Sequence, residues 1–297
     1  DKAREMYRRI SLVAPSDISV LIRGASGTGK EHIALELHEQ SRRRNRPYIT
    51  LDCGSLPEDL AASELFGHRK GAFTGAESDK VGLLQEADGG TLFVDEIGNL
   101  SYKSQMLLLR ALQEKCYRPV GSTRERGFDI RLIAATNENL EEAIAGGRFR
   151  EDLFHRLNEF TIRVPLLSEC PEDILPLARF LLGHLMKEHH KRVQGFDRLA
   201  EAALRRYPWP GNIRELRNAL RSALLLTDGD WITATSLNLD LTLKQEEVPS
   251  LTEEEKERLL LLQTLEQTGN NRSKTAKLLN MSRTTLYEKL RKYGIIC

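Results

Sequence analysis

Two short motifs hold residues that could carry out phosphate chemistry. The first runs from Gly24 to Lys30 and reads Gly-Ala-Ser-Gly-Thr-Gly-Lys. Its glycines allow backbone N–H groups to surround phosphates, and its lysine can reach the β- and γ-phosphates of a nucleotide. Glu31 follows, where a Mg²⁺-binding Ser or Thr is usual, so that hydroxyl ligand is missing. The expected nucleotide contacts in this segment are Gly24, Ala25, Ser26, Gly27, Thr28, Gly29, Lys30 and Glu31.

The second motif is a pair of acids, Asp95-Glu96, directly after the apolar run Leu92-Phe-Val94. A buried strand with this ending delivers its carboxylates to the edge of a parallel sheet where ligands bind. We expect Asp95 to hold Mg²⁺ and Glu96 to orient or deprotonate the attacking water. Paired acids are also common in turns, but beside the first motif they indicate hydrolysis of ATP.

Further polar residues could contact a nucleotide, and some of them have a second explanation. Asn137 ends an apolar strand and could sense the γ-phosphate, although an ordinary turn asparagine fits equally well. Arg150 and Arg156 lie six residues apart and suit the charge of a transferring phosphoryl group. Surface ion pairs with Glu151 and Asp152 would explain these arginines without a nucleotide. Arg214 opens a helix after the turn Trp209-Pro-Gly-Asn212 and could reach back to the nucleotide.

The hexapeptide Gly71-Ala72-Phe73-Thr74-Gly75-Ala76 has no acid, base or metal ligand. Alone, six small residues around one Phe indicate a turn, because glycine allows the backbone to bend sharply. Between the two nucleotide motifs, the same segment indicates a chemically inert loop through which ATP hydrolysis acts on another molecule.

The elements that position these residues alternate between strands and helices. Apolar, β-branched runs predict strands at 19–22, 47–51, 90–94 and 130–135, and helical spacing predicts helices at 31–40 and 104–114. This alternation predicts a parallel α/β sheet with helices on both faces. After Val164-Pro165 the pattern is purely helical, with helices expected at 174–187, 198–207 and 212–226.

Length and composition limit the classes of protein to which the chain can belong. Its 297 residues suffice for two or three domains, and its net charge is only +1. No apolar run approaches the ~18 residues of a membrane span, so we expect no membrane association. The four cysteines (Cys53, Cys116, Cys170 and Cys297) form no Cys-x-x-Cys pair, which favours free thiols in the cytoplasm. A start at Asp1 rather than Met indicates a fragment whose N-terminal neighbour is unknown.

Basic residues concentrate in the last 28 positions, which hold seven Lys or Arg against one acid, a local charge of +6. Two short helices across a turn at Met281-Ser282, with Leu286 and Leu290 facing inward, predict a helix-turn-helix. Its second helix would enter the major groove of DNA. A small helical dimerisation unit is the alternative. The expected DNA contacts are Arg272, Arg283, Thr284, Thr285 and Lys289.

The motifs occur in one fixed order: the glycine loop, Glu64-Leu-Phe-Gly67, the hexapeptide, Asp95-Glu96, the two arginines and the Trp209 segment. In this order the chain resembles the bacterial enhancer-binding proteins, the AAA+ activators of sigma-54 RNA polymerase (the NtrC-like family). The resemblance extends over nearly the whole chain. The C-terminal segment is similar to the Fis-type DNA-binding domain.

The resemblance implies a homo-oligomer, from dimer to hexamer, that couples ATP and Mg²⁺ chemistry to opening of promoters. Arg150 and Arg156 would act on a neighbour's site, Arg214 would be a second nucleotide sensor, and residues 71–76 would project and contact the sigma-54 holoenzyme. Enhancer DNA would be the second partner, and a two-component receiver would be one source of regulation. Three departures from the family's usual residues bear on coupling: Ala25, Arg69 and Asp52, which stands where many members have an Asn that switches the catalytic Glu.

These inferences divide the chain into an AAA+ core at 1–165, a helical lid at 166–238, a linker at 239–250 and the DNA-binding unit at 251–297. The expected function is a sigma-54-dependent transcriptional activator with ATPase activity. A DNA-binding regulator of the same fold without sigma-54 coupling is the alternative. A helicase or protein-unfolding ATPase would leave the terminal helix-turn-helix unexplained.

Overall fold

The computed structural model describes residues 2–239, except the side chains of Glu58 and Asp59, and eight later positions: Arg272, Thr275, Ala276, Met281, Thr285, Leu286, Lys289 and Leu290. The chain forms two compact units, Asp1–Leu241 and Thr242–Cys297. Within the described part of the chain, no helix has the length and apolar character that a membrane span requires.

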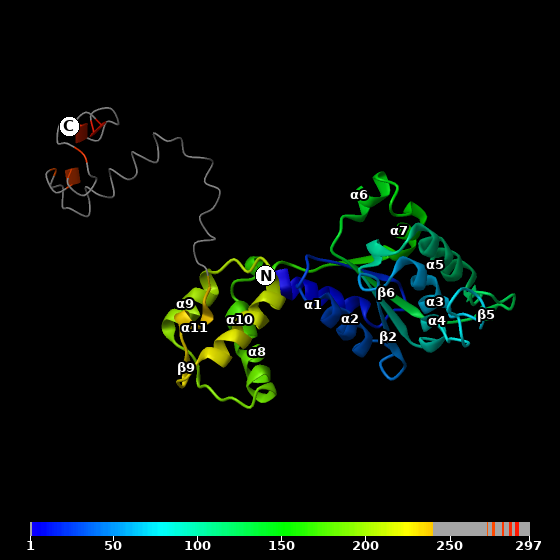
Figure 1. Ribbon diagram of the computed structural model, residues 1–297, viewed down its shortest axis with the longest axis horizontal. Coiled ribbons are helices and arrows are strands. Elements are labelled where there is room, and N and C mark those ends of the chain that lie inside the picture. The colour runs from blue at the N-terminus through cyan, green and yellow to red at the C-terminus, as the bar shows by residue number, and fades with distance from the viewer. Residues whose placement is uncertain are drawn as a thin grey trace. The chain divides into compact units, whose positions relative to one another are not determined.

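The first unit is built on a parallel sheet of five strands in the order β2-β3-β6-β1-β7 (Figure 1). These strands are β1 (Val20–Arg23), β2 (Tyr48–Asp52), β3 (Thr91–Asp95), β6 (Arg131–Thr136) and β7 (Phe160–Arg163). Four of them match the predicted strands to within one residue at either end. The parallel register and the interleaved order confirm the predicted α/β class.

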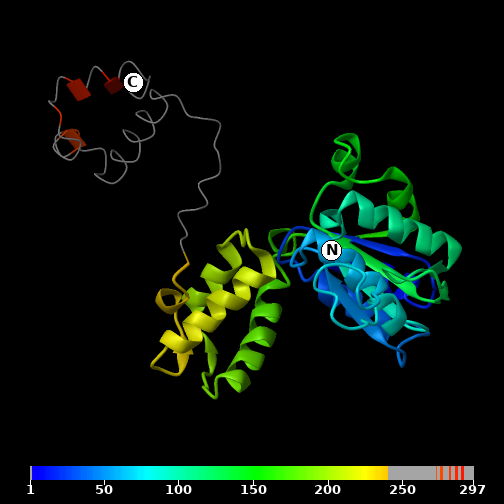
Figure 2. The ribbon, with the colours of Figure 1, turned by 45° about the vertical axis from the view of Figure 1, so that its right-hand side comes forward.

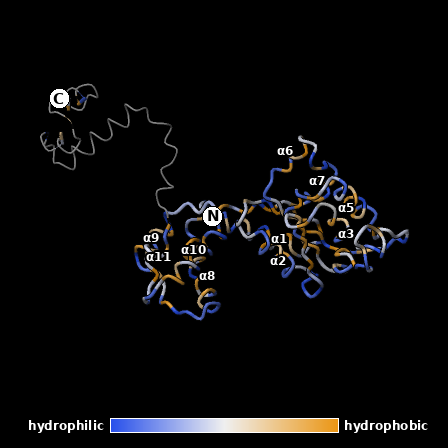
Figure 3. The backbone as a smooth tube through the Cα atoms, in the orientation of Figure 1, coloured by the Kyte–Doolittle hydropathy of each residue, from blue (hydrophilic) through white to orange (hydrophobic). Residues whose placement is uncertain are grey.

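Side chains along each strand alternate between two apolar layers, because successive Cβ atoms point to opposite faces of a sheet. On β6, Leu132 and Ala134 join one buried cluster, whereas Ile133 and Ala135 join the other. The middle residues of the central strands are therefore apolar, as in strands covered on both faces, and polar residues stand at the strand ends. Figure 3 shows the apolar segments gathered along the sheet and the inner sides of its helices.

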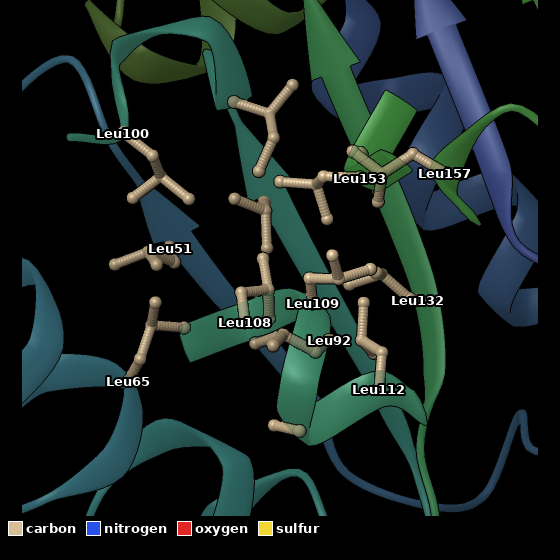
Figure 4. Close-up of a cluster of buried hydrophobic side chains, with 14 of the residues drawn as sticks. Leu51, Leu65, Leu92, Leu100, Leu108, Leu109, Leu112, Leu132, Leu153 and Leu157 are labelled. Carbon is tan, nitrogen blue, oxygen red and sulfur yellow. The ribbon is translucent and has the colours of Figure 1, made fainter. Parts of the chain in front are cut away.

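Helices cover both faces of the sheet (Figure 2). Two of them, α1 (Lys2–Val13) and α2 (Lys30–Glu39), pack into one cluster through Ile10, Val13, Ile33 and Leu37. The other face holds α3 (Glu58–Phe66), α4 (Leu83–Glu86), α5 (Tyr102–Glu114), α6 (Leu140–Ala145) and α7 (Glu151–Leu157). Figure 4 shows leucines of α3, α5 and α7 meeting those of β2, β3 and β6.

A two-stranded antiparallel ribbon, β4 (Cys116–Tyr117) and β5 (Arg126–Gly127), extends from the end of α5. His68 forms bridges to Lys80 and to Val120, which lies between these two strands. The segment that carries the hexapeptide is thereby attached to the ribbon.

The lid contains α8 (Ile174–Glu188), α9 (Arg198–Arg206), α10 (Asn212–Leu226) and α11 (Ala234–Leu237) around an apolar cluster of its own. The prediction of a purely helical lid was wrong, because β8 (Gly195–Phe196) and β9 (Trp231–Ile232) form a short parallel pair. Two-residue strands are too short to display an alternating pattern, so their pairing arises only when the helices pack.

In the second unit, Arg272, Thr275, Ala276, Thr285, Leu286, Lys289 and Leu290 are helical, and Met281 is not. The Met281 N–H donates to the Ala276 carbonyl at 3.0 Å, a bond spanning five residues of the kind that ends a helix. Leu286 and Leu290 are buried, as predicted from their spacing. Arg283, Thr284 and the linker after Leu239 lie outside the described residues.

Candidate nucleotide-binding site

The glycine loop connects β1 to α2 and curls over the first turn of the helix. Gly27 and Gly29 have φ angles of 76° and 88°, a left-handed conformation that L side chains rarely adopt. The Thr28 hydroxyl donates to the Ala25 carbonyl at 2.8 Å and closes the loop. The Gly24 N–H donates to the Thr136 carbonyl at 3.2 Å, which joins the loop to the end of β6. The remaining loop amides precede a helix N-terminus, which favours an anion.

Lys30 is buried and folded back onto this loop. Its ammonium donates to the carbonyls of Gly24 at 3.1 Å and Ala25 at 3.3 Å. Burial lowers the pKa of Lys30, and the nearby carboxylates of Asp95 and Glu96 oppose that shift. A cation removed from water whose hydrogen bonds, among the described residues, go to neutral carbonyls is poised to interact with phosphate oxygens.

Asp95 and Glu96 lie at the carboxyl end of β3, as predicted. The Asp95 carboxylate accepts the Glu96 N–H at 2.9 Å. Among the described residues, no three His, Cys, Asp or Glu side chains converge as metal ligands do. Mg²⁺ commonly takes one or two carboxylates and completes its shell with phosphates and water, so a single half-buried carboxylate at the loop fits this ion. Asp95 would hold it, and the ion would neutralise charge developing on the phosphates.

The lid contacts the glycine loop through the start of α10. The Arg214 guanidinium donates to the Ser26 hydroxyl at 2.8 Å, and its backbone N–H donates to the Gly27 carbonyl at 3.2 Å. Buried Asn212 donates from Nδ2 to the Ser26 carbonyl at 3.1 Å. Arg214 therefore stands at the glycine loop, and its contact with a nucleotide stays a prediction.

Asn137 and the two arginines differ in their placement. Asn137 is exposed directly after β6, next to the Thr136–Gly24 bond, and so lies beside the glycine loop. Arg150 instead donates two hydrogen bonds to the Asp152 carboxylate, at 2.6 and 3.0 Å. Its guanidinium carbon lies 5.1 Å from the centroid of the Tyr102 ring. Arg156 pairs with Glu159. Within one subunit both arginines thus form local ion pairs, and their action on a neighbour's nucleotide stays a prediction.

The hexapeptide forms a closed loop. Gly71 and Gly75 have φ angles of 79° and 100°, and the Gly71 N–H donates to the Ala76 carbonyl at 2.9 Å. Thr74 is exposed, while the edge of the Phe73 ring packs on His68 with 4.9 Å between ring centroids. Phe73 is thus exposed over 37% of its surface while its ring contacts His68, and its contact with sigma-54 stays a prediction.

The base of this loop is fixed by charged side chains. Asp79 accepts the Lys70 N–H at 2.8 Å and pairs with Arg69. The backbone bond and then the guanidinium lower the pKa of Asp79. Arg69, a departure from the family's usual residue, thus has an internal partner.

Three residues near the site were missed by sequence reasoning: Gly54, Asn99 and Asn212. Asn99 donates from Nδ2 to Glu96 Oε2 at 2.9 Å. A Cβ on Gly54 would stand 2.1 Å from the same Glu96 oxygen. The signal for Asn99 was its position three residues after Glu96, whereas Gly54 reaches the site only through pairing of β2 with β3. Cys53 is buried as expected, and burial raises the pKa of its thiol to about 12.

Comparison with known families divides the chain into three matched regions. Residues 1–163 match the family described as the Sigma-54 interaction domain. Residues 168–254 match the AAA+ ATPase lid domain, and residues 252–293 match the Bacterial regulatory protein, Fis family.

Individual relatives agree with these matches. The transcriptional regulatory protein ZraR of Klebsiella oxytoca is 48% identical over 295 residues, which cover 97% of this chain and 66% of ZraR. GlrR of Escherichia coli K12 is 42% identical over 292 residues, covering 98% and 66%. The crystal structure of NtrX from Brucella abortus in complex with ADP has a TM-score of 0.75 at 34% identity, covering 99% of this chain and 67% of that one. The chain thus spans about 66% of the length of the curated relatives it matches.

Proposed function

The chain belongs to the Sigma-54 interaction domain family, and on that premise we propose that it is a sigma-54-dependent transcriptional activator that hydrolyses ATP. The observation that carries the proposal is the presence, in one domain, of a glycine-rich phosphate-binding loop with its lysine and a closed, exposed loop at residues 71–76 that has no catalytic side chain. The phosphate-binding loop would bind the ATP whose hydrolysis supplies energy, and the loop at residues 71–76 has an exposed surface suited to contact with another protein.

In this proposal ATP binds with its phosphates against the loop amides and the Lys30 ammonium. The phosphates replace the Gly24 and Ala25 carbonyls as partners of that ammonium. Asp95 holds Mg²⁺, and Glu96 orients the attacking water and accepts its proton. Asn137 and Arg214 sense the γ-phosphate from β6 and from the lid, where both lie beside the glycine loop.

The active assembly is a homo-oligomeric ring in which Arg150 and Arg156 complete a neighbouring subunit's site. Their guanidiniums would exchange Asp152 and Glu159 for phosphate oxygens, which is a feasible exchange because both ion pairs are solvent-accessible. The relative NtrX was crystallised with ADP, which supports nucleotide binding by a chain of this fold.

The Phe73–Thr74 loop engages sigma-54 and transmits the nucleotide state to the closed promoter complex. The second unit, whose buried Leu286 and Leu290 support a helix-turn-helix, holds the protein on enhancer DNA. Arg272, Thr285 and Lys289 lie on its helices, and Arg283 and Thr284 would stand next to them in sequence. The proposed division remains a core at 1–165, a lid at 166–238, a linker at 239–250 and a DNA-binding unit at 251–297.

The test separates hydrolysis from promoter opening in one preparation. Thr74→Ala should hydrolyse ATP within about twofold of wild type, because Thr74 is remote from Lys30, Asp95 and Glu96, yet form no open complexes with sigma-54 holoenzyme. Ser78→Ala removes an exposed hydroxyl from the same segment outside the hexapeptide and should retain both activities. Normal promoter opening by Thr74→Ala would refute sigma-54 coupling through this loop, and a wild-type chain that opens no promoters would favour the uncoupled DNA-binding regulator.

A further inference from the structure

The carboxylate of Glu96 is fixed from one side by Asn99. Glu96 has left-handed backbone angles, φ 50° and ψ 44°, and precedes the short helix η1 (Ile97–Asn99). Because of this turn, Asn99 makes two hydrogen bonds with Glu96. Its backbone N–H donates to the Glu96 carbonyl at 2.9 Å, and its side-chain Nδ2 donates to Glu96 Oε2 at 2.9 Å. An ionised carboxylate only accepts hydrogen bonds, so the amide must present its NH₂ group here.

The Glu96 oxygen that Asn99 binds also lies close to Gly54, which has Asp52 as a second neighbour. The position of a Cβ on Gly54 would lie 2.1 Å from Glu96 Oε2 and 3.2 Å from Asp52 Oδ1. Asp52 Oδ1 accepts the Gly54 N–H at 2.9 Å. A carboxylate has no N–H group to donate to Glu96, so Asp52 cannot replace an amide at this position.

A neutral amide thus bonds the Glu96 carboxylate, and a second carboxylate lies near the same glutamate oxygen beside Gly54. The amide of Asn99 holds Oε2 in place, whereas the carboxylate of Asp52 cannot donate a hydrogen bond to it. In the proposed function, Oε1, which Asn99 does not bind, would accept the proton from water. Asn99 is exposed, so its contact with Glu96 reflects this specific bond rather than burial.

We propose that Asn99 is the positioning residue of the catalytic glutamate in this protein, and that it supplies the amide donor that Asp52 cannot. The inference rests on the proposed function, in which Glu96 acts on the attacking water. It assigns a role in catalysis to a residue outside the glycine loop and outside the acidic pair.

The test uses the whole chain and three variants. Asn99→Asp keeps the size of the side chain but replaces the donor with a second carboxylate. We expect its kcat for ATP to fall at least tenfold, while KM and the Kd for ADP stay within twofold. Asp52→Asn alone should change kcat less than twofold, because Asn99 still supplies the donor. The double variant should recover most of the lost kcat, because an amide then faces Glu96 from the Gly54 side.

A loss of nucleotide affinity in parallel with kcat would indicate a merely structural role and overturn the inference. So would a kcat of Asn99→Asp within twofold of wild type, or a loss that Asp52→Asn leaves unchanged. A wild-type chain without ATPase activity would overturn the proposed function itself, and the inference with it. An active wild type with an insensitive Asn99→Asp would overturn the inference alone.

Discussion

Replacing Gly27 with alanine would insert a methyl group between the glycine loop and the lid. Gly27 has a φ of +76°, and a Cβ built there would lie 2.4 Å from the Gly211 carbonyl oxygen and 3.0 Å from Arg214 Cβ. Gly211 directly precedes α10, whose first residues bind Ser26 and Gly27. The methyl group therefore clashes with backbone, which cannot rotate away as a flexible side chain can.

Two costs add in this variant. A left-handed conformation costs an L residue about 1–2 kcal/mol. Overpacking against a fixed neighbour costs about 1–3 kcal/mol more. Gly29→Ala provides a matched control, because Gly29 has a φ of +88° but its Cβ would lie only in ordinary contact, 3.5 Å from Ile213 Cδ1. Both variants incur the backbone cost, and only Gly27→Ala displaces the lid.

Displacement of the lid moves Arg214 away from Ser26, and in the proposed function from the phosphates, so the additional cost should appear in nucleotide binding. We expect the Kd for ADP, measured by calorimetry, to be roughly 5- to 150-fold higher for Gly27→Ala than for Gly29→Ala, the equivalent of about 1–3 kcal/mol. Thermal unfolding would show that both variants are folded. Equal affinities in two folded variants would refute the view that this contact holds the lid on the nucleotide site.

Three further predictions concern other parts of the chain. Arg156→Ala should lower ATPase activity, and mixing it with Glu96→Gln should restore part of it, because some interfaces then pair an intact finger with an intact glutamate; no recovery at any ratio would exclude action between subunits. Burial raises the pKa of Cys53 to about 12, so its thiol should stay neutral at pH 8 and form thiolate only as the pH approaches 12. Mass spectrometry should therefore find that iodoacetamide modifies the less buried Cys116 before Cys53. Lys289→Ala should weaken DNA binding equally across sequences and reduce the slope of log affinity against log salt by about 1, and an unchanged slope would remove Lys289 from the phosphate contacts.

Sequence reasoning located the central strands because both of their faces are buried. Val20–Arg23 and Arg131–Thr136 each hold an uninterrupted run of three or four apolar residues, and that pattern does not depend on which neighbours cover them. Phe160–Arg163 was not predicted. This strand lies at the edge of the sheet and is only partly buried, so its residues Phe, Thr, Ile and Arg show no clear apolar run.

The residues of the candidate site likewise fall into those that the sequence predicts and those that it does not. Lys30, Asp95 and Glu96 belong to contiguous motifs in which spacing alone fixes the chemistry, so they could be assigned from the sequence. The role of Gly54 depends on β2 lying next to β3, and that of Asn212 on the lid docking against Ser26. Contacts between distant segments leave no local pattern, and a glycine or asparagine in a loop fits many turns equally well.

The contacts around Glu96 also bear on how one domain performs two tasks. Its carboxylate packs against Gly54, and the chain continues from there into α3, where the Ser63 hydroxyl lies 2.7 Å from His68 Nδ1. His68 in turn supports the Phe73 ring. These contacts, joined by the chain from Gly54 into α3, lead from the proposed base to the loop that should touch sigma-54. Such a series transmits force only if its members differ between nucleotide states, because a ligand shifts only conformations that it binds unequally. Asn99→Asp perturbs one end of the series without touching the nucleotide, so its effect on promoter opening per ATP hydrolysed would measure whether the position of Glu96 is what the loop responds to.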